Sequence, residues 1–235
     1  MMRVLRSAVL MGTLAAVLVL ASPAGSANEC EGLQVCVPIV GPWVAVPTSG
    51  GAVRPEVAWQ LTCPRNYIVG GLDAELSRRA IDVSFLGTLG SPVNPGITTS
   101  RSVTFVAKHV GRSSGWSSFK PYIGCMPTQG GGTRVPTSVS AFPPGQPATR
   151  RAKNVRVRPG TATVGLACRS GERLVGASHA FGLFTRTPPG ASLVSSVSGS
   201  RIVRSGQVRV TVRGDAELQG VRAVLQVQAI CARQR

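Results

Sequence analysis

Aromatic residues, acidic residues and histidine are scarce in this chain of 235 residues. Phe, Trp and Tyr make up only 5%, so a hydrophobic core has to be built mainly from Val, Leu, Ile and Ala. The 9 acidic residues and 2 histidines leave few side chains that can move protons at an active site. This shortage argues against an enzyme, although a secreted hydrolase with an unrecognised site stays open as an alternative.

Long apolar runs are also missing, apart from residues 8–20 near the N-terminus. That run follows Arg3 and Arg6 and precedes a series of small residues, which is the pattern of a secretory signal peptide. It is shorter than the roughly 20 residues of a membrane-spanning helix. We therefore expect a signal peptide that is cleaved after Ala27 and a mature chain with no membrane span, secreted to the extracellular space or the cell envelope. An uncleaved N-terminal anchor is the alternative.

The sequence contains no Cys-x-x-Cys pair of the kind that structural zinc sites use. We expect no metal site and no cofactor. All 6 cysteines follow the predicted signal peptide, and an even number in an exported chain is typical of a disulfide framework. Spacing alone does not choose among the pairings of 6 cysteines.

Two parts of the chain resemble each other. The segment from Cys63 to Cys125 is almost as long as the segment from Cys168 to Cys231. Residues 68–71 (Ile-Val-Gly-Gly) match residues 174–177 (Leu-Val-Gly-Ala), and a strand-like run rich in Val and Thr follows later in each segment. We interpret the match as an internal duplication.

A second match links the segments that precede the two copies, because residues 36–49 and 125–138 both begin with Cys-x-Pro and are identical at half of their positions. If each copy closes on itself, the chain forms three disulfides, Cys30–Cys36, Cys63–Cys125 and Cys168–Cys231. A pairing across the two copies is the competing arrangement.

The hydrophobic pattern predicts strands rather than helices, and the best helix candidate, residues 74–80, is short and uncapped. Val208, Val210 and Val212 alternate with polar residues, as expected for a half-buried strand. Residues 223–231 alternate in the same way, except that Val224 and Ile230 interrupt the pattern. Clusters of Gly and Pro separate the predicted strands. We predict an all-β protein of two tandem disulfide-locked, β-sandwich-like modules.

The same features give a division of the chain. We expect a signal peptide (1–27), an N-terminal lead-in with a small disulfide loop (28–57), a first β-module (58–129), a basic linker rich in Gly and Pro (130–153) and a second β-module (154–235).

The formal charge is +17, and nearly all of it comes from arginine, since Lys108, Lys120 and Lys153 are the only lysines. Arginine binds carboxylates and phosphates with two parallel hydrogen bonds. Outside the cytoplasm, the anions that such a surface meets are acidic polymers and envelope components. We do not expect nucleic acid to be the physiological partner. Excess arginine on a solvated β surface is the other interpretation.

Trp116 lies between two predicted strands and is flanked by Arg112 and Lys120. An aromatic ring between two cations on a loop suits a ligand with a flat ring and a negative charge. We name Arg112, Trp116 and Lys120 as the candidate ligand-binding residues. The alternative is that Trp116 covers a sheet edge.

Residues 111–115 match Gly-x-Ser-x-Gly, but the hydrolase turn with this motif is followed by a helix, and no helix is predicted here. His109 and His179 share the strand phase of apolar neighbours, which favours partly buried, hydrogen-bonded side chains over catalytic ones. We therefore name no catalytic residue. The leading hypothesis is a secreted, non-enzymatic binding protein or envelope-associated protein for anionic partners, and a structural or inhibitor-like scaffold is a further alternative.

Overall fold

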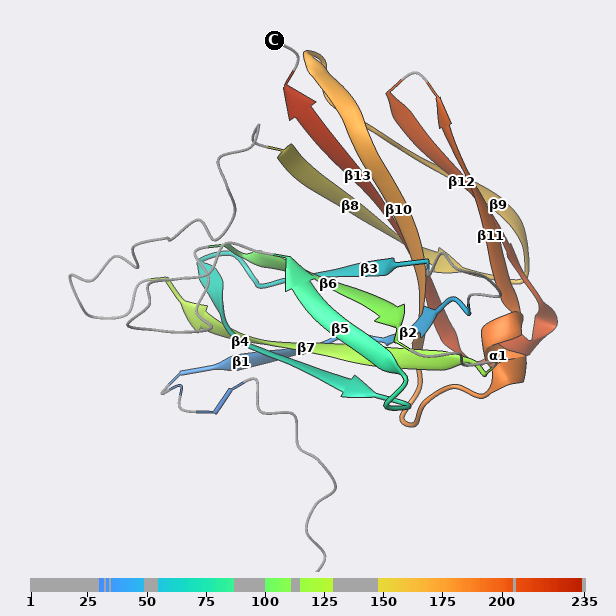
Figure 1. Ribbon diagram of the computed structural model, residues 1–235, viewed down its shortest axis with the longest axis horizontal. Coiled ribbons are helices and arrows are strands. Elements are labelled where there is room, and N and C mark those ends of the chain that lie inside the picture. Colours follow the sequence, from blue (N-terminus) through green and yellow to red (C-terminus); the bar gives the residue numbers. More distant parts are fainter. Residues whose placement is uncertain are drawn as a thin grey trace, which may run out of the picture.

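The computed structural model describes residues 30–31, 33, 35–48, 55–86, 100–110, 115–128, 148–204 and 206–233 (Figure 1). Within these ranges the fold is all-β, as predicted, with one short helix and one 3-10 turn. The predicted signal peptide and most of the predicted linker lie outside the described residues. None of the described helices has the length and apolar character that crossing a membrane requires.

The strands fall into two groups that we call the first and second halves. The first half contains β1 (Val37–Val40), β2 (Trp43–Val46), β3 (Val57–Thr62), β4 (Tyr67–Leu76), β5 (Ile81–Leu86), β6 (Ser102–His109) and β7 (Ser117–Pro127). The second half contains β8 (Ala148–Val157), β9 (Gly160–Ala167), β10 (Glu172–Phe184), α1 (Ala191–Ser195), β11 (Val197–Arg204), β12 (Gln207–Gly214), the 3-10 turn Ala216–Leu218 and β13 (Arg222–Arg233).

A seven-stranded central sheet runs through both halves in the order β1-β7-β2-β10-β13-β8, with β4 paired to the other edge of β7. Strand β2 makes the connection, because Val44 pairs with Phe119 of β7 and with Gly182 of β10. Two three-stranded sheets, β3-β6-β5 and β11-β12-β9, complete the fold. The halves are therefore joined by backbone hydrogen bonds.

The pairing pattern of the first half recurs in the second. Sheet β3-β6-β5 corresponds to sheet β9-β12-β11, and the pair β4–β7 corresponds to the pair β10–β13. A bulge interrupts both pairs at the same point, next to the partners Val69–Cys125 and Leu174–Cys231. The pairing therefore aligns Val69 with Leu174, whereas the sequence match aligned Ile68 with Leu174.

The turn that leads into β4 recurs in the turn that leads into β10. Asn66 and Gly171 each follow the first cysteine by the same interval, and both have a positive φ, 65° and 77°. Among non-glycine residues, Asn is one of the few that adopt this left-handed conformation readily. The same turn is therefore built from two different residues.

All three predicted disulfides are confirmed: Cys30–Cys36, Cys63–Cys125 and Cys168–Cys231. The two long bridges join Cys63, just after β3, to β7 and Cys168, just after β9, to β13. The corresponding half-cystines Cys125 and Cys231 are buried in two separate cores.

The two cores lie on opposite faces of the central sheet. Phe119 of β7 packs with Trp59 and Phe105 of the first small sheet. Leu225 of β13 packs with Val208 and Val210 of the second small sheet. In β2, Val44 and Val46 belong to the first core and Ala45 packs against the second, since successive side chains of a strand point to opposite faces. In Figure 1, β10 and β13 accordingly lie between β3 and the sheet of β9, β11 and β12.

This arrangement explains why residues 223–231 do not alternate strictly. Strand β13 is buried on both faces, and Val224 packs into the first core while Leu225 packs into the second. On the first face, Gln226 and Gln228 are fully buried and bond to the backbone of β3: Nε2 of Gln226 donates to the carbonyl oxygen of Gln60 (3.0 Å), and Nε2 of Gln228 donates to that of Ala58 (3.2 Å).

Two local expectations need adjustment. Strand β8 begins at Ala148, so residues 148–153 of the predicted linker are paired to β13. Residues 74–80 resembled a short helix, but residues 74–76 belong to β4, which pairs with β7. In both places the backbone hydrogen bonds of a neighbouring strand override a weak local signal.

Candidate functional site

A cavity of about 560 Å³ lies where the two halves meet, beside β10. Strand β10 pairs with β13 along its length, but on its other edge it pairs with β2 only at Gly182 and Leu183. The cavity lies alongside the rest of that edge. Its walls come from both halves, and they are mainly apolar: Ala45, Pro47, Pro55, Val57, Ala180, Phe181, Val194 and Val197.

Trp116, one of the three residues predicted from the sequence, lines this cavity. It immediately precedes β7 and is 39% exposed, whereas Trp59 in the first core is only 2% exposed. Trp116 is therefore not a core residue, and its indole ring offers apolar surface to a ligand.

Ser178 and His179 contribute the polar groups from β10. Within the described part of the chain, Oγ of Ser178 and Nδ1 of His179 are buried and have no hydrogen-bond partner. The imidazole also bonds to the backbone of Gly199 and meets the ring of Phe181 edge to face at 5.8 Å. These contacts fix the ring, and they leave Nδ1 as an unused hydrogen-bonding atom.

The pKa of His179 lies below its ordinary value because burial disfavours the charged imidazolium. The positive charge of Arg201 lowers it further, and the hydrogen bond to Gly199 acts in the opposite direction. At neutral pH the imidazole is therefore uncharged, and the Nδ1 atom, which has no proton when Nε2 donates to Gly199, is an acceptor.

Arg201 and Glu56 are the charged residues of the cavity wall. Nη1 of Arg201 donates a hydrogen bond to the carbonyl oxygen of Ala177, on the open edge of β10. The remaining N–H groups of the guanidinium stay available for a ligand. The Glu56 carboxylate is 4.0 Å from Nζ of Lys108, so its negative charge is partly balanced.

The structure does not bring the predicted residues Trp116 and Lys120 to the same site. Lys120 points from β7 toward Trp43 and Tyr122, with Nζ at 5.7 and 5.5 Å from the two ring centroids. Arg112 lies outside the described residues.

Sequence reasoning missed Ser178 and Arg201, and it interpreted His179 as a residue of partly buried strand. These residues are far from Trp116 in the chain and reach it only because β2 joins the two halves. The one local signal was that His179, a rare residue in this sequence, shares a strand with small and apolar neighbours.

A second feature is the outward face of sheet β11-β12-β9, which we call the arginine face. It consists of the exposed side chains opposite the buried Val208, Val210 and Val212, namely Arg204, Arg209 and Arg213 with Thr161, Thr163, Ser198, Ser200, Ile202 and Thr211. These three strands contain no acidic residue. Arg213 forms an ion pair with Asp215, which lies just after β12, at 3.5 Å.

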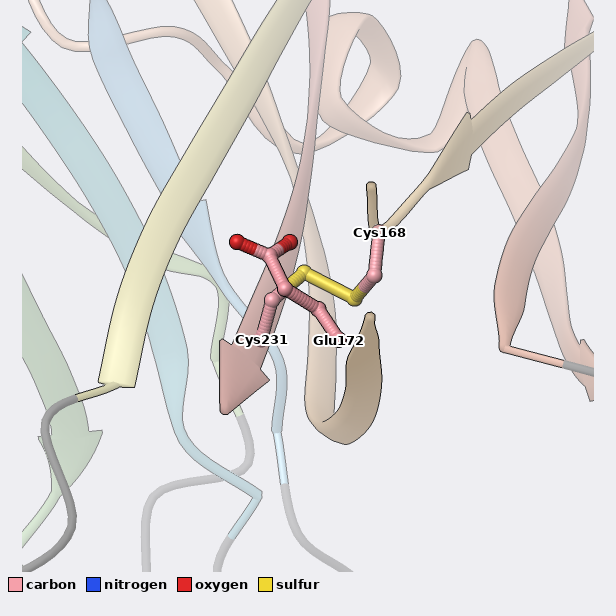
Figure 2. Close-up of side chains that lie close together, drawn as sticks. All are labelled: Cys168, Glu172 and Cys231. Atoms are coloured by element: carbon pink, nitrogen blue, oxygen red, sulfur yellow. A yellow bond between two sulfur atoms is a disulfide. The ribbon is translucent and has the colours of Figure 1, made fainter. Parts of the chain in front are cut away.

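One further cluster has the residue types of a metal site. Cys168, Glu172 and Cys231 place their sulfur and carboxylate oxygen atoms within 4.8 Å of one another (Figure 2). The two sulfur atoms are joined in a disulfide, and thiolates are the form of cysteine that binds metals. This cluster is therefore not a metal site.

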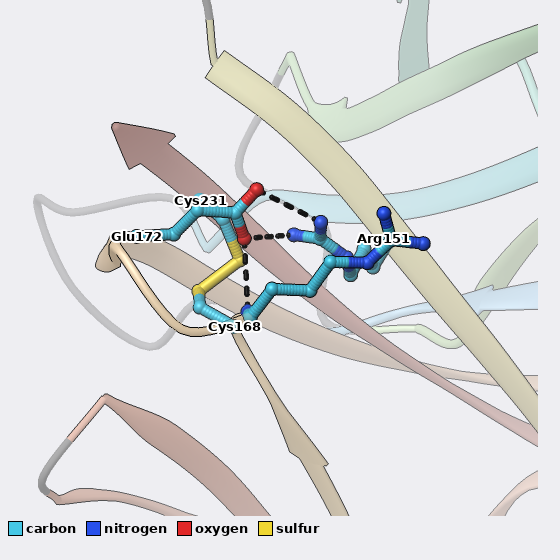
Figure 3. A network of polar contacts seen from close by, with 5 residues as sticks. Arg151, Cys168, Glu172 and Cys231 are labelled. Carbon is cyan, nitrogen blue, oxygen red and sulfur yellow. Dashed lines mark hydrogen bonds and ion pairs between the residues drawn. A yellow bond between two sulfur atoms is a disulfide. The ribbon is translucent and has the colours of Figure 1, made fainter. Parts of the chain in front are cut away.

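The Glu172 carboxylate is instead bound by arginine (Figure 3). Arg151 donates from Nη1 and Nη2 to its two oxygens at 2.6 and 2.9 Å, and the backbone N–H of Arg169 donates at 2.9 Å. These hydrogen bonds, those of Arg151 first, hold the pKa of Glu172 below its ordinary value. The cluster fastens β8 to the start of β10 beside the disulfide.

The arrangement of the cavity suits binding. Ser178 and His179 are consecutive on a strand, so their side chains point to opposite faces and do not form a nucleophile–base pair. The Gly-x-Ser-x-Gly match at 111–115 is followed by strand β7, and the first four of its residues lie outside the described part. In comparisons with family models, curated proteins and solved structures, no significant match to this chain was found.

Proposed function

We propose that this protein is a secreted, non-enzymatic binding protein for an acidic polysaccharide, and that it binds the polymer through the arginine face. The observation that carries the proposal is the distribution of charge on that face. Three exposed arginines and a set of hydroxyl side chains lie on three neighbouring strands without an acidic residue.

The geometry of a sheet suits a repeating ligand. Side chains two residues apart on one strand are about 6.7 Å apart, so Arg209 and Arg213 on β12 present charges roughly 13 Å from each other. Guanidinium groups bind carboxylates with two hydrogen bonds each, and the Thr and Ser hydroxyls supply donors and acceptors for sugar hydroxyls. Single exposed ion pairs contribute little, but several such contacts along one polymer add up.

A polysaccharide fits this face better than a lipid surface does. Proteins that lie on membranes insert apolar side chains between the headgroups. The arginine face carries only one large exposed apolar residue, Ile202, beside Arg209. The proposal therefore commits to a polymer that bears carboxylates.

We further infer that the two halves are β-sandwich-like modules that arose by duplication. The supporting observations are the recurring strand pairing, the bulges beside Cys125 and Cys231, and the positive φ at Asn66 and Gly171. Each half also packs a small three-stranded sheet on its own part of the central sheet.

Secretion belongs to the same proposal. Three disulfides and the absence of a membrane-spanning helix in the described residues fit an extracellular protein. The N-terminal pattern predicts cleavage after Ala27. N-terminal sequencing of the protein recovered from the medium of a secreting host tests this directly, and Asn28 is the expected first residue.

The test of function is a binding measurement with polygalacturonate, a polymer with one carboxylate on each sugar. The triple variant Arg204→Gln/Arg209→Gln/Arg213→Gln removes the arginine face. We expect it to bind about tenfold more weakly, since exposed ion pairs contribute roughly 0.5 kcal/mol each.

The matched control is Arg65→Gln/Arg156→Gln/Arg173→Gln, which removes the same charge from exposed positions outside the arginine face. The proposal predicts that this control loses much less affinity. Equal losses in the two variants would reduce the effect to net charge alone and would contradict a site on the arginine face.

A further inference from the structure

The cavity beside β10 has a chemistry of its own, separate from the arginine face. It combines one aromatic surface, one imidazole whose buried Nδ1 atom has no hydrogen-bond partner in the described residues, and one guanidinium. Its volume of about 560 Å³ is within the range of small-molecule sites. These groups come from the two halves, with Trp116 from the first and the polar residues from the second.

The unpartnered Nδ1 atom of His179 indicates a polar ligand. Buried polar groups in proteins almost always have hydrogen-bond partners, and those that lack one need an explanation. Nδ1 of His179 is an acceptor in the neutral ring, so a ligand hydroxyl group satisfies it. The Ser178 side chain points to the opposite face of β10 and does not share this ligand.

Trp116 sets the shape of the ligand. Its indole is half-buried in the cavity wall, with the exposed part directed to solvent or ligand. A sugar ring has an apolar face of C–H bonds and a rim of hydroxyls, so it covers an indole while its rim reaches polar groups at the side.

Arg201 sets the charge of the ligand. It lies on the cavity wall beside His179, and one N–H group is already used by the carbonyl oxygen of Ala177. A carboxylate binds well to the remaining N–H groups. The opposing charge on the wall, Glu56, lies near Lys108 and is thereby partly balanced.

We propose that this cavity binds one sugar unit bearing a carboxylate, with its ring on Trp116, a hydroxyl on His179 and its carboxylate on Arg201. This rests on the proposed function in that the polymer held by the arginine face supplies such a unit. The cavity then selects the sugar, while the arginine face provides attachment along the chain. Because both halves build the cavity, neither half binds the sugar alone.

The test uses trigalacturonate and the neutral trigalactose in isothermal titration calorimetry. The wild-type protein is expected to bind the acidic trisaccharide at least tenfold more tightly than the neutral one. Trp116→Ala is expected to weaken both by at least tenfold, while Arg201→Gln weakens only the acidic one and brings it to the level of the neutral one.

Two variants serve as controls. Arg173→Gln removes a charge from the same strand as His179 but outside the cavity, and we expect unchanged binding of both trisaccharides. Arg201→Lys keeps the charge without the two-pronged geometry, and it is expected to restore part of the lost affinity. If Trp116→Ala and Arg201→Gln unfold at near-native temperatures, their weaker binding is due to the missing side chain and not to a loss of folded protein.

The outcomes separate this inference from the proposed function. If trigalacturonate does not bind, or binds equally to the wild type and to Trp116→Ala, the cavity site is refuted, whatever the arginine face does. If trigalacturonate binds through Trp116 but the triple arginine variant retains all affinity for polygalacturonate, the cavity site stands and the arginine face is refuted.

Discussion

Strands β7 and β13 occupy equivalent places in the two halves, yet their side chains differ where their surroundings differ. Counting back from the closing cysteine, Tyr122 and Lys120 of β7 correspond to Gln228 and Gln226 of β13. The β7 pair is partly exposed, and the β13 pair is fully buried under β3. The same scaffold thus carries a cation on an aromatic ring in one half and a buried amide network in the other.

The comparison shows how two similar halves become one molecule. Strand β3 of the first small sheet also packs on β10 and β13 of the second half. Ala180 of β10 and Val224 of β13 belong to the first core, and β13 is hydrogen-bonded to β3. The Gln226 side chain accepts a hydrogen bond from the backbone N–H of Gln60 at 2.6 Å and donates to Oδ1 of Asn154 at 2.9 Å. Arg150 donates to Oε1 of Gln228 at 2.7 Å. The contact between the halves is therefore specific and polar.

The largest expected effect comes from removing the long disulfides. Their loops are nearly equal, with sequence separations of 62 and 63, so the chain-entropy model assigns each about 4 kcal/mol. We expect Cys63→Ala/Cys125→Ala and Cys168→Ala/Cys231→Ala to lower the free energy of unfolding by similar amounts in urea denaturation. A difference of more than about 2 kcal/mol would show that the two halves do not use their bridges alike.

The next effect tests the buried amides against their exposed counterparts. Gln226→Ala leaves the backbone groups of Gln60 without partners, and we expect a loss of about 1–3 kcal/mol. Lys120→Ala at the equivalent place removes only the cation–π contacts with Trp43 and Tyr122 and should cost about 0.5–1 kcal/mol. If the two substitutions cost the same in denaturant titrations, β3 does not hold the halves together in the way described.

A smaller effect on stability is expected at the cavity. Trp116→Ala should change the free energy of unfolding by about 0.5 kcal/mol, as for an exposed site. Trp59→Ala in the first core serves as the comparison and should cost about 3–5 kcal/mol. If thermal unfolding shows that Trp116→Ala loses as much stability as Trp59→Ala, Trp116 supports the fold, as in the alternative that it covers a sheet edge.

The strands and disulfides were predictable because they depend on local or repeated signals. Alternation identified β12, and the two nearly equal cysteine intervals identified the bridges. The burial of β13 on both faces was not predictable, since Val224 interrupts the alternation for a reason that lies in the first half. Of the residues that line the cavity, only Trp116 was a candidate from the sequence, because Ser178 and Arg201 come near it through sheet pairing that the sequence does not reveal.

The smallest effect concerns pH and is expected mainly in the second half. His179 has a lowered pKa in the fold, so the unfolded chain binds a proton more readily and stability falls as pH decreases below the ordinary value of 6.5. Glu172 also has a lowered pKa, so its ion pair stabilises the fold above 4.5 and is lost as pH falls further.

Urea midpoints measured between pH 8 and pH 3 check these signs. We expect His179→Gln to remove the upper part of the pH dependence and Glu172→Gln to remove the lower part. An unchanged profile in His179→Gln would mean that this imidazole is not desolvated in the folded protein.

The salt dependence of polygalacturonate binding tests the central claim most directly. Association that relies on ion contacts releases counterions, so the logarithm of the binding constant falls linearly with the logarithm of salt concentration, with a slope set by the number of contacts. We predict that the triple variant of Arg204, Arg209 and Arg213 has a shallower slope than both the wild-type protein and the control lacking Arg65, Arg156 and Arg173. If the triple variant keeps the wild-type slope, the polymer does not bind to the arginine face.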